Sequence, residues 1–347
     1  MTLLAQRFHK LSSLAHLPLS RPTPIERLDG LSDETGNDLW VKRDDLSAEL
    51  YGGNKVRKLE FLLADARRRG CKSIVTTGAY GSHHVLATSL FGAHWNFNVH
   101  AVVVAQPWTP HVEENLRCVL GAGTEVHRAP AWPIVATKTA SLLAGLTARG
   151  LSPYRVPHGG SSVVGTLGYV EAGLELAAQI DSGEIPEPSA IFVALGSGGT
   201  VAGLSVGLAA MGFTTPVIGV RVTPRLVCNR AVVVNLINNT VRYLRNIDPS
   251  FPDVAKGAGR LLKVHSDHYG GGYGAVDGAT TEALKRSEQA GLVLDPTYTA
   301  KAFAAFFSAA ASGRNGRRLL FWNTLSSADL SPLLENAPQI PSDFGAP

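Results

Sequence analysis

The chain has 347 residues, of which 45% are hydrophobic and 17% are charged, and its formal net charge is +4 at pH 7. This composition can bury a large core and predicts a folded protein of two lobes. The small net charge, without a long basic run interleaved with aromatics, argues against a nucleic-acid partner, and no apolar run is long enough to span a membrane.

The three cysteines, Cys71, Cys118 and Cys228, are widely spaced and form no CxxC pair. This spacing argues against a disulfide framework and against a zinc site, so we expect no metal. A reducing compartment fits these cysteines best. Since no signal-peptide pattern is found, we expect a cytoplasmic protein.

Predicted helices alternate along the chain with short apolar strands. We expect strands at 73–77, 101–105, 125–128, 191–195, 217–222 and 319–323, and helices after Asn54 and at 85–93, 112–120, 134–149, 231–245 and 279–290, with a long helix starting near 163. Strands that alternate with helices predict an α/β fold with parallel sheets covered on both sides. Such sheets bind ligands at the carboxyl ends of their strands.

The segment 41–66 places a lysine in the first turn of a predicted helix. After Asn54 the apolar residues recur every three or four positions, so we expect a helix that Asn54 caps. The positive end of the helix dipole should lower the pKa of Lys55, and a partly neutral lysine can attack a carbonyl. An alternative is that Lys55, Arg57 and Lys58 form a solvated basic face.

A glycine-rich loop, GSGGTVAGL at residues 196–204, follows a predicted buried strand and opens a helix. Backbone N–H groups in such a turn can hold a phosphate. The loop lacks the GK[ST] of a Walker motif, and Val201 stands where the third glycine of GxGxxG would be. The alternative is a tight strand–helix turn without a ligand.

Four motifs occur in a fixed order along nearly the whole chain: KRDDL with GGNKVRKLEF, PHGGSSVVGTLGY, GSGGT and DPTYTAKA. Together they resemble the family of D-cysteine desulfhydrases and 1-aminocyclopropane-1-carboxylate deaminases. The resemblance implies the tryptophan-synthase-β-like fold (fold type II), in which each of two lobes has a mostly parallel twisted sheet flanked by helices. It places a small domain at 51–160 and a large cofactor-binding domain at 1–50 plus 161–337, and the Pro-rich composition after Pro338 predicts a loose tail at 338–347. A homodimer is also expected.

The resemblance implies pyridoxal 5'-phosphate as cofactor, joined to Lys55 as a Schiff base, with the 196–204 loop around its phosphate. Lys55 would then remove the Cα proton of the substrate. His83 replaces an asparagine that the family carries near the phenolic oxygen of the cofactor. The residues expected to bind the cofactor are Asn54, Lys55, His83, Ser197, Gly198, Gly199, Thr200 and Thr299.

Three further residues are expected on the substrate side. Ser82 matches the family's serine near the substrate, where its hydroxyl could bind a carboxylate or relay a proton. Tyr273 matches a tyrosine of a Tyr-Gly pair, and Tyr298 is a possible acid or base. Ser82 could instead cap the next helix, and Tyr273 could be an ordinary packed tyrosine.

Thr299 helps to select the reaction. By the resemblance it lies beside the ring nitrogen, where deaminases that open the cyclopropane ring carry glutamate and desulfhydrases carry threonine. A hydroxyl would tend to leave the ring neutral, and a weaker electron sink suits a good leaving group. We therefore expect a lyase that acts by β-elimination and deamination on a small amino acid such as D-cysteine, giving a keto acid, ammonia and the leaving group.

Departures from the family pattern keep other functions open. They are Gly81, His83, Ala300 and the pair Leu325-Ser326. The alternatives are a 1-aminocyclopropane-1-carboxylate deaminase, a lyase for a different or larger amino acid, and a cofactor-binding protein with little catalysis. A nucleotide-binding α/β enzyme would depend on the glycine loop alone.

Overall fold

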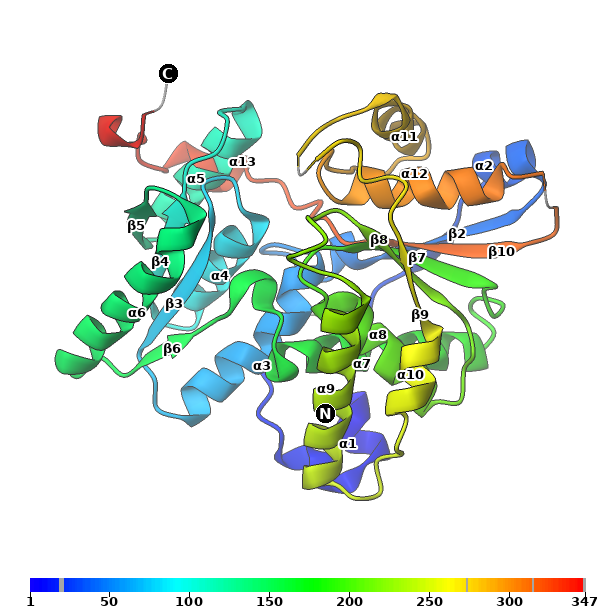
Figure 1. The fold of residues 1–347 in the computed structure, drawn as a ribbon, viewed down its shortest axis with the longest axis horizontal. Helices are drawn as coiled ribbons and strands as arrows, with labels where there is room; N and C mark the ends of the chain where they lie inside the picture. Colours follow the sequence, from blue (N-terminus) through cyan, green and yellow to red (C-terminus); the bar gives the residue numbers. More distant parts are fainter. Residues whose placement is uncertain (19–21, 273, 314, 346–347) are drawn as a thin grey trace. The chain divides into compact units, whose positions relative to one another are not determined.

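The computed structural model describes residues 1–18, 22–272, 274–313 and 315–345 (Figure 1). The chain divides into two compact units. Unit 1 comprises Met1–Leu14, Pro18–Lys58 and Ser161–Ser327, and unit 2 comprises Ala15–Leu17, Leu59–Gly160 and Ala328–Pro347. Each unit has its own mostly parallel sheet, which confirms the predicted α/β class. Among the described residues, no helix has both the length and the apolar character needed to cross a membrane.

The sheet of unit 1 has six strands in the order β1-β2-β10-β7-β8-β9. Their bounds are Ile25–Arg27 (β1), Asp38–Arg43 (β2), Ala190–Leu195 (β7), Val217–Arg221 (β8), Leu262–His265 (β9) and Arg318–Asn323 (β10). Only the edge pair β1–β2 is antiparallel. All residues of the central strand β7 are buried, as expected for a parallel strand covered on both faces.

Helices cover both faces of this sheet (Figure 1). Their bounds are Leu3–Arg7 (α1), Asp29–Thr35 (α2), Asn54–Arg68 (α3, of which unit 1 holds the first turn), Val163–Asp181 (α7), Gly199–Ala210 (α8), Arg230–Ile247 (α9), Ala255–Leu261 (α10), Gly278–Gln289 (α11) and Thr299–Ala310 (α12). On the α12 side, Phe303 and Phe306 pack against Phe321 of β10, with ring centroids 5.1 and 5.8 Å apart. This aromatic cluster fixes the helix whose start carries Thr299.

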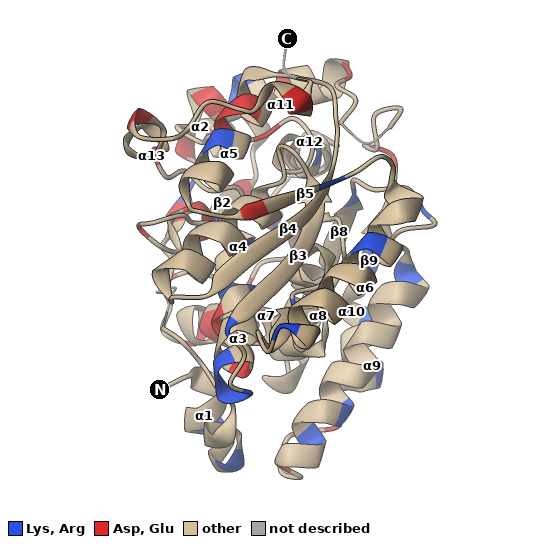
Figure 2. Cartoon of the chain, turned by 90° about the vertical axis from the view of Figure 1, so that its left-hand side faces the viewer, with Lys and Arg blue, Asp and Glu red and all other residues tan. Residues whose placement is uncertain are grey.

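The sheet of unit 2 has four parallel strands in the order β5-β4-β3-β6. Its elements are β3 (Ser73–Ala79), α4 (His83–His94), β4 (Asn98–Val104), α5 (Pro110–Gly121), β5 (Glu125–Ala129), α6 (Trp132–Ala148), β6 (Pro153–Arg155) and α13 (Ser331–Glu335). Figure 2 shows β3 and β4 without Lys, Arg, Asp or Glu, whereas β5 carries charges of both signs. The charged residues of this sheet therefore lie on its edge strands, since β6 also carries Arg155.

The last described residues pack within unit 2. The Trp108 indole N–H donates to the Gly345 carbonyl oxygen at 2.7 Å, and the Phe344 ring lies 5.4 Å from that of Tyr80. Arg128 pairs with Asp343 at 3.2 Å. The segment after Pro338, expected to be loose, thus makes polar and aromatic contacts.

The predicted strands and helices are confirmed, with ends that shift by a few residues. The prediction missed short elements, among them the three-residue strands β1 and β6, because so few residues carry no readable alternation. It also missed α12, whose apolar residues recur on almost every position of TAKAFAAFFSAA. Because nearly every residue is apolar, the sequence alone does not show the helical spacing of the side chains that face the core.

Candidate active site

Lys55 lies in the first turn of α3, and its amine has a lowered pKa. The helix begins at Asn54 itself, so Asn54 is its first residue rather than a preceding cap. The Lys55 Nζ donates to Asn54 Oδ1 at 2.5 Å, and Asn54 Nδ2 donates to Thr200 Oγ1 at 3.2 Å. Burial of the amine lowers the pKa of Lys55 to about 8, which a charge from Asp295 partly opposes. The predicted direction is confirmed, but burial is its main cause, not the helix dipole.

The glycine loop forms a tight turn into α8. Gly198 precedes the helix with φ +93°, a left-handed conformation that favours glycine. The first N–H groups of α8, at Gly199 and Thr200, lie at the positive end of the helix dipole. Both residues are buried. The loop therefore has the geometry of an anion-binding nest.

Ser161 joins this loop to α3. Its Oγ accepts from the Gly199 N–H at 3.0 Å and from Lys58 Nζ at 3.2 Å, and it lies 2.7 Å from Ser197 Oγ. A Cβ atom at Gly199 would lie 2.6 Å from Ser161 Oγ and 3.2 Å from Lys58 Nζ. Only glycine at this position lets the hydroxyl and the amine approach the loop so closely.

Lys58 is buried, with 2% of its surface exposed, and burial lowers its pKa well below the ordinary value, with a further lowering by the Lys55 charge. Arg57 is equally buried. The idea of a solvated basic face is therefore wrong for these two residues. The sequence analysis did not select Lys58 or Ser161 as site residues, although both lie inside the quoted motifs.

The turn before α3 is held by the segment that follows β10. The Asn54 N–H donates to the Thr324 carbonyl at 3.1 Å, and the Gly52 N–H donates to Ser326 Oγ at 2.9 Å. Gly53 has φ +82°, and a Cβ there would lie 2.6 Å from the Thr324 oxygen. The unusual Leu325-Ser326 pair therefore has a structural role, because Ser326 fixes the turn in front of Lys55.

Thr299 is buried at the start of α12 and is bound to Asp295. Its Oγ1 donates to Asp295 Oδ2 at 2.8 Å and accepts from the Asp295 N–H at 2.8 Å. The Asp295 carboxylate also accepts the N–H groups of Thr297 and Tyr298. Asp295 thus organises the DPTYTAKA segment and acts on the Lys55 charge, a role that the sequence analysis missed. An Asp-Pro pair just before a helix is the signal that could have found it.

Tyr298 is the residue before α12 and packs on the aromatic core of unit 1. A Cβ at Gly196 would lie 3.5 Å from its Cε1. Tyr298 and the glycine loop are therefore neighbours within the unit. Tyr273 lies outside the described residues.

Ser82 and His83 belong to unit 2. Ser82 is the N-cap of α4, and its Oγ accepts from the Val85 N–H at 3.4 Å, so the capping alternative is confirmed. The His83 ring lies 4.6 Å from that of His111. A Cβ at Gly81 would lie 2.9 Å from Val112 Cγ2, so close packing of α5 accounts for this glycine without a larger substrate.

Comparison with known proteins identifies the family of the chain. Residues 17–324 match the family described as pyridoxal-phosphate dependent enzyme. D-cysteine desulfhydrase from Salmonella paratyphi B is 35% identical over 304 residues, which are 85% of this chain and 88% of the relative.

Two solved structures have the same fold. An ACC deaminase homologue has a TM-score of 0.78 at 30% identity, and the match covers 94% of this chain and 98% of the homologue. Threonine deaminase isoform 2 from Solanum lycopersicum has a TM-score of 0.63 at 17% identity, covers 96% and 92% of the two chains, and supports the fold alone. The chain belongs to the family of pyridoxal-phosphate dependent enzymes.

Proposed function

We propose that the protein is a lyase that removes the β-substituent and the amino group of a small amino acid such as D-cysteine. For D-cysteine, the Cα proton goes to a base, the Cβ–S bond breaks with its electron pair going to sulfur, and one water supplies the oxygen of the keto group. The products are pyruvate, sulfide and ammonia. The similarity to D-cysteine desulfhydrase supports this substrate class.

One observation carries the proposal: the half-buried Lys55, with a pKa of about 8, shares unit 1 with an anion nest of glycine N–H groups, a serine hydroxyl and a lysine. The donors of the nest are of the kind that binds the phosphate of the cofactor, namely backbone N–H groups, hydroxyls and an amine, and a phosphate could take the place of Ser161 Oγ as acceptor of the Gly199 N–H. The room that Gly199 leaves between Ser161 and Lys58 supports the fit. When bound, the cofactor supplies an electron sink for the pair released at Cα.

The residues of this chain would divide the remaining tasks. Lys55 would attach the cofactor, since an amine with a pKa of about 8 is partly neutral at pH 7 and can act as a nucleophile. Freed from that bond, the same amine would remove the Cα proton. Asn54 would orient it through the 2.5 Å hydrogen bond. Lys58, Ser161, Ser197, Gly198, Gly199 and Thr200 would bind the phosphate.

The other expected residues stay proposals. Thr299 would face the ring nitrogen with an uncharged hydroxyl, which, unlike a carboxylate, has no negative charge to keep the nitrogen protonated. Tyr298 would act as an acid or base near the glycine loop. Ser82, His83 and Tyr273 would contact the substrate or the phenolic oxygen. The contacts of Ser82 with α4 leave its O–H hydrogen available to an oxygen of the substrate.

The test is a panel of D- and L-amino acids with product detection. We expect pyruvate and sulfide from D-cysteine, little turnover of L-cysteine, and none after Lys55→Ala. Retention of bound cofactor without any keto acid from the panel would instead indicate a binder with little catalysis.

A 1-aminocyclopropane-1-carboxylate deaminase is the second candidate, because the ACC deaminase homologue is similar in structure. The panel includes this substrate. Its ring opening would release 2-oxobutyrate, which separates the two activities.

We also propose a homodimer in a reducing compartment, the cytoplasm. Three free cysteines among the described residues, two of them buried, support the compartment. Light scattering of the purified protein tests the dimer, with a monomer mass as the contrary result.

A further inference from the structure

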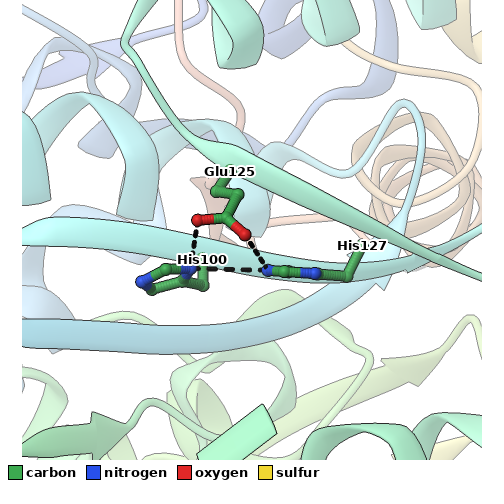
Figure 3. A group of neighbouring side chains, drawn as sticks. All are labelled: His100, Glu125 and His127. Atoms are coloured by element: carbon green, nitrogen blue, oxygen red, sulfur yellow. Dashed lines mark hydrogen bonds and ion pairs between the residues drawn. The ribbon is translucent and has the colours of Figure 1, made fainter. Parts of the chain in front are cut away.

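Two histidines and a glutamate meet on neighbouring strands of unit 2. His100 lies on β4, and Glu125 and His127 lie on β5, where His100 is paired with Glu125. Residues two apart on a strand share a face, so Glu125 and His127 project to the same side as His100. Figure 3 shows the carboxylate of Glu125 facing both rings. The reaction proposed above uses none of these side chains.

The distances among the donor atoms suit one ion. His100 Nδ1 is 3.4 Å from His127 Nε2, and the carboxylate oxygens of Glu125 lie 3.2 Å from the first nitrogen and 3.3 Å from the second. In a tetrahedral zinc site with bonds of about 2.0–2.1 Å, two ligand atoms lie about 3.3 Å apart. An ion beside the three side chains could therefore contact all of them with little movement.

The chemistry of the donors also suits a metal. The ligand atoms are one imidazole nitrogen each from His100 and His127 and a carboxylate oxygen of Glu125, and all lie within 4.8 Å of one another. A neutral imidazole offers one lone pair, and imidazole with carboxylate is a common donor set for zinc. Paired strands hold the groups on a rigid support.

We propose that His100, Glu125 and His127 bind a divalent transition-metal ion of the zinc class, which ties β4 to β5. The three protein ligands leave a fourth position to water, as the side chain of Glu125 is 61% exposed. The expectation of no metal rested on cysteine spacing alone, and this group contains no cysteine. In the sequence, the site is marked by Glu-Val-His on one strand and by a second histidine on the neighbouring strand.

Two features weaken the site relative to a structural zinc centre. The charge of Lys138 acts on His127 and that of Arg149 acts on His100, and each disfavours a further positive charge. Nε2 of His100 is buried and has no hydrogen-bond partner among the described residues. The outer hydrogen bond that usually orients a ligating histidine is therefore missing on this ring.

The experiment measures zinc bound by the holoenzyme after treatment with a chelator and transfer to a phosphate-free buffer. ZnCl2 is titrated by calorimetry, and the bound ions are counted by elemental analysis. We expect the wild type to bind one more ion than His127→Ala, and Glu125→Ala to bind that ion at least about tenfold more weakly. Zinc should also raise the Tm of the wild type more than that of either variant, whereas MgCl2 should not.

Matched variants assign the ion. His94→Ala removes an exposed histidine from the same unit, and His268→Ala breaks a different histidine pair, in which His265 Nε2 and His268 Nδ1 lie 2.9 Å apart. Both should retain the ion that His127→Ala loses. The proposal is overturned if the wild type binds no such ion, or if His127→Ala and Glu125→Ala bind zinc as the wild type does. Glu125→Ala changes an exposed side chain, so it keeps the test valid should His127→Ala fail to fold.

Discussion

Arg57 and Lys58 are consecutive residues of α3, and both are 2% exposed, yet their surroundings differ. Arg57 donates to the carboxylates of Asp44 and Glu175 at 2.8 and 2.9 Å. Although burial opposes it, these carboxylates hold the pKa of Arg57 well above its ordinary value. Lys58, by contrast, donates to the Ser161 hydroxyl. Burial holds the pKa of the Lys58 amine well below its ordinary value.

The surroundings of Arg57 indicate a role in stability, and those of Lys58 indicate a role in binding. The charge network around Arg57 is compensated inside the fold, and Tyr169 and Lys42 complete it with hydrogen bonds to Asp44 and Glu175. Removal of one partner leaves a buried charge. The nest around Lys58 instead gathers hydrogen-bond donors at a helix start, where an external anion would be stabilised. We therefore expect Arg57 to stabilise the fold and its neighbour Lys58 to bind the ligand.

The largest effect is expected from Arg57→Met. It leaves the buried carboxylates of Asp44 and Glu175 without their arginine partner, so the free energy of unfolding should fall by about 3–5 kcal/mol. Urea denaturation measures this change. Arg68→Met on the same helix is the control, because this exposed side chain should contribute less than about 0.5 kcal/mol. Equal stability of the two variants would contradict the account of the network.

Lys58→Met should affect cofactor affinity and not reduce stability, in contrast to Arg57→Met. The unfolding free energy of the cofactor-free protein should stay the same or rise, since a buried charge is removed. Affinity for pyridoxal 5'-phosphate should fall about 10–100-fold, the equivalent of a charged hydrogen bond. Absorbance titration measures the affinity. If the cofactor affinity of this variant is unchanged, Lys58 does not bind the phosphate.

A smaller pair of changes sharpens the comparison. Tyr169→Phe removes the O–H that donates to Asp44 at 2.6 Å and should cost about 1–2 kcal/mol of stability, with cofactor affinity unchanged. Ser161→Ala should reduce cofactor affinity several-fold, with a stability change below about 1 kcal/mol. If each variant altered both quantities alike, the two regions would not be separate.

The smallest effects are slopes with pH. The pKa of Glu175 is held at about 2, because Arg57 and Lys42 outweigh its burial. Its stabilising contribution is therefore present above its ordinary pKa of about 4.5 and lost as pH falls toward 2.

For the cofactor-free protein, burial of Lys55 disfavours its charged form and destabilises the fold at neutral pH, but the slope with pH has the same sign as that of Glu175. The pKa of Lys55 is lowered from 10.5 to about 8, so the unfolded chain binds more protons between these values and stability should rise with pH across this window. Lys55→Met should make this rise shallower, and Lys58, whose pKa is also lowered, should account for part of the rise that is left. Thermal unfolding at a series of pH values measures both slopes, and a flat wild-type profile above pH 8 would contradict the buried amine.

The sequence predicts features that depend on neighbouring residues and misses those that depend on contacts between distant parts of the chain. The start of α3 and the glycine loop were predictable, because a helix period and a glycine turn are local signals. The burial of Lys58 was not, since it depends on Ser161, which lies 103 residues away in the chain. A lysine three residues after Lys55 has the same spacing as a solvated charge on a helix surface.

The site shows the same division. The motif DPTYTAKA drew attention to Thr299, but the Asp295 carboxylate organises that segment, and only the folded turn reveals this. The cap formed by Ser82 was an open alternative, because a serine before a helix has that geometry in most proteins. The histidines of β4 and β5 come together through strand pairing, which no local pattern specifies.

The central claim is that Lys55 carries the cofactor while Lys58 holds its phosphate. Lys58 is buried and Lys55 is half-buried, and burial lowers the pKa of each. A lowered pKa alone therefore does not choose between them. The direct measurement is borohydride reduction of the holoenzyme followed by peptide mass mapping. The account predicts the pyridoxyl group on Lys55, and a group found on Lys58, or on neither lysine, would contradict it.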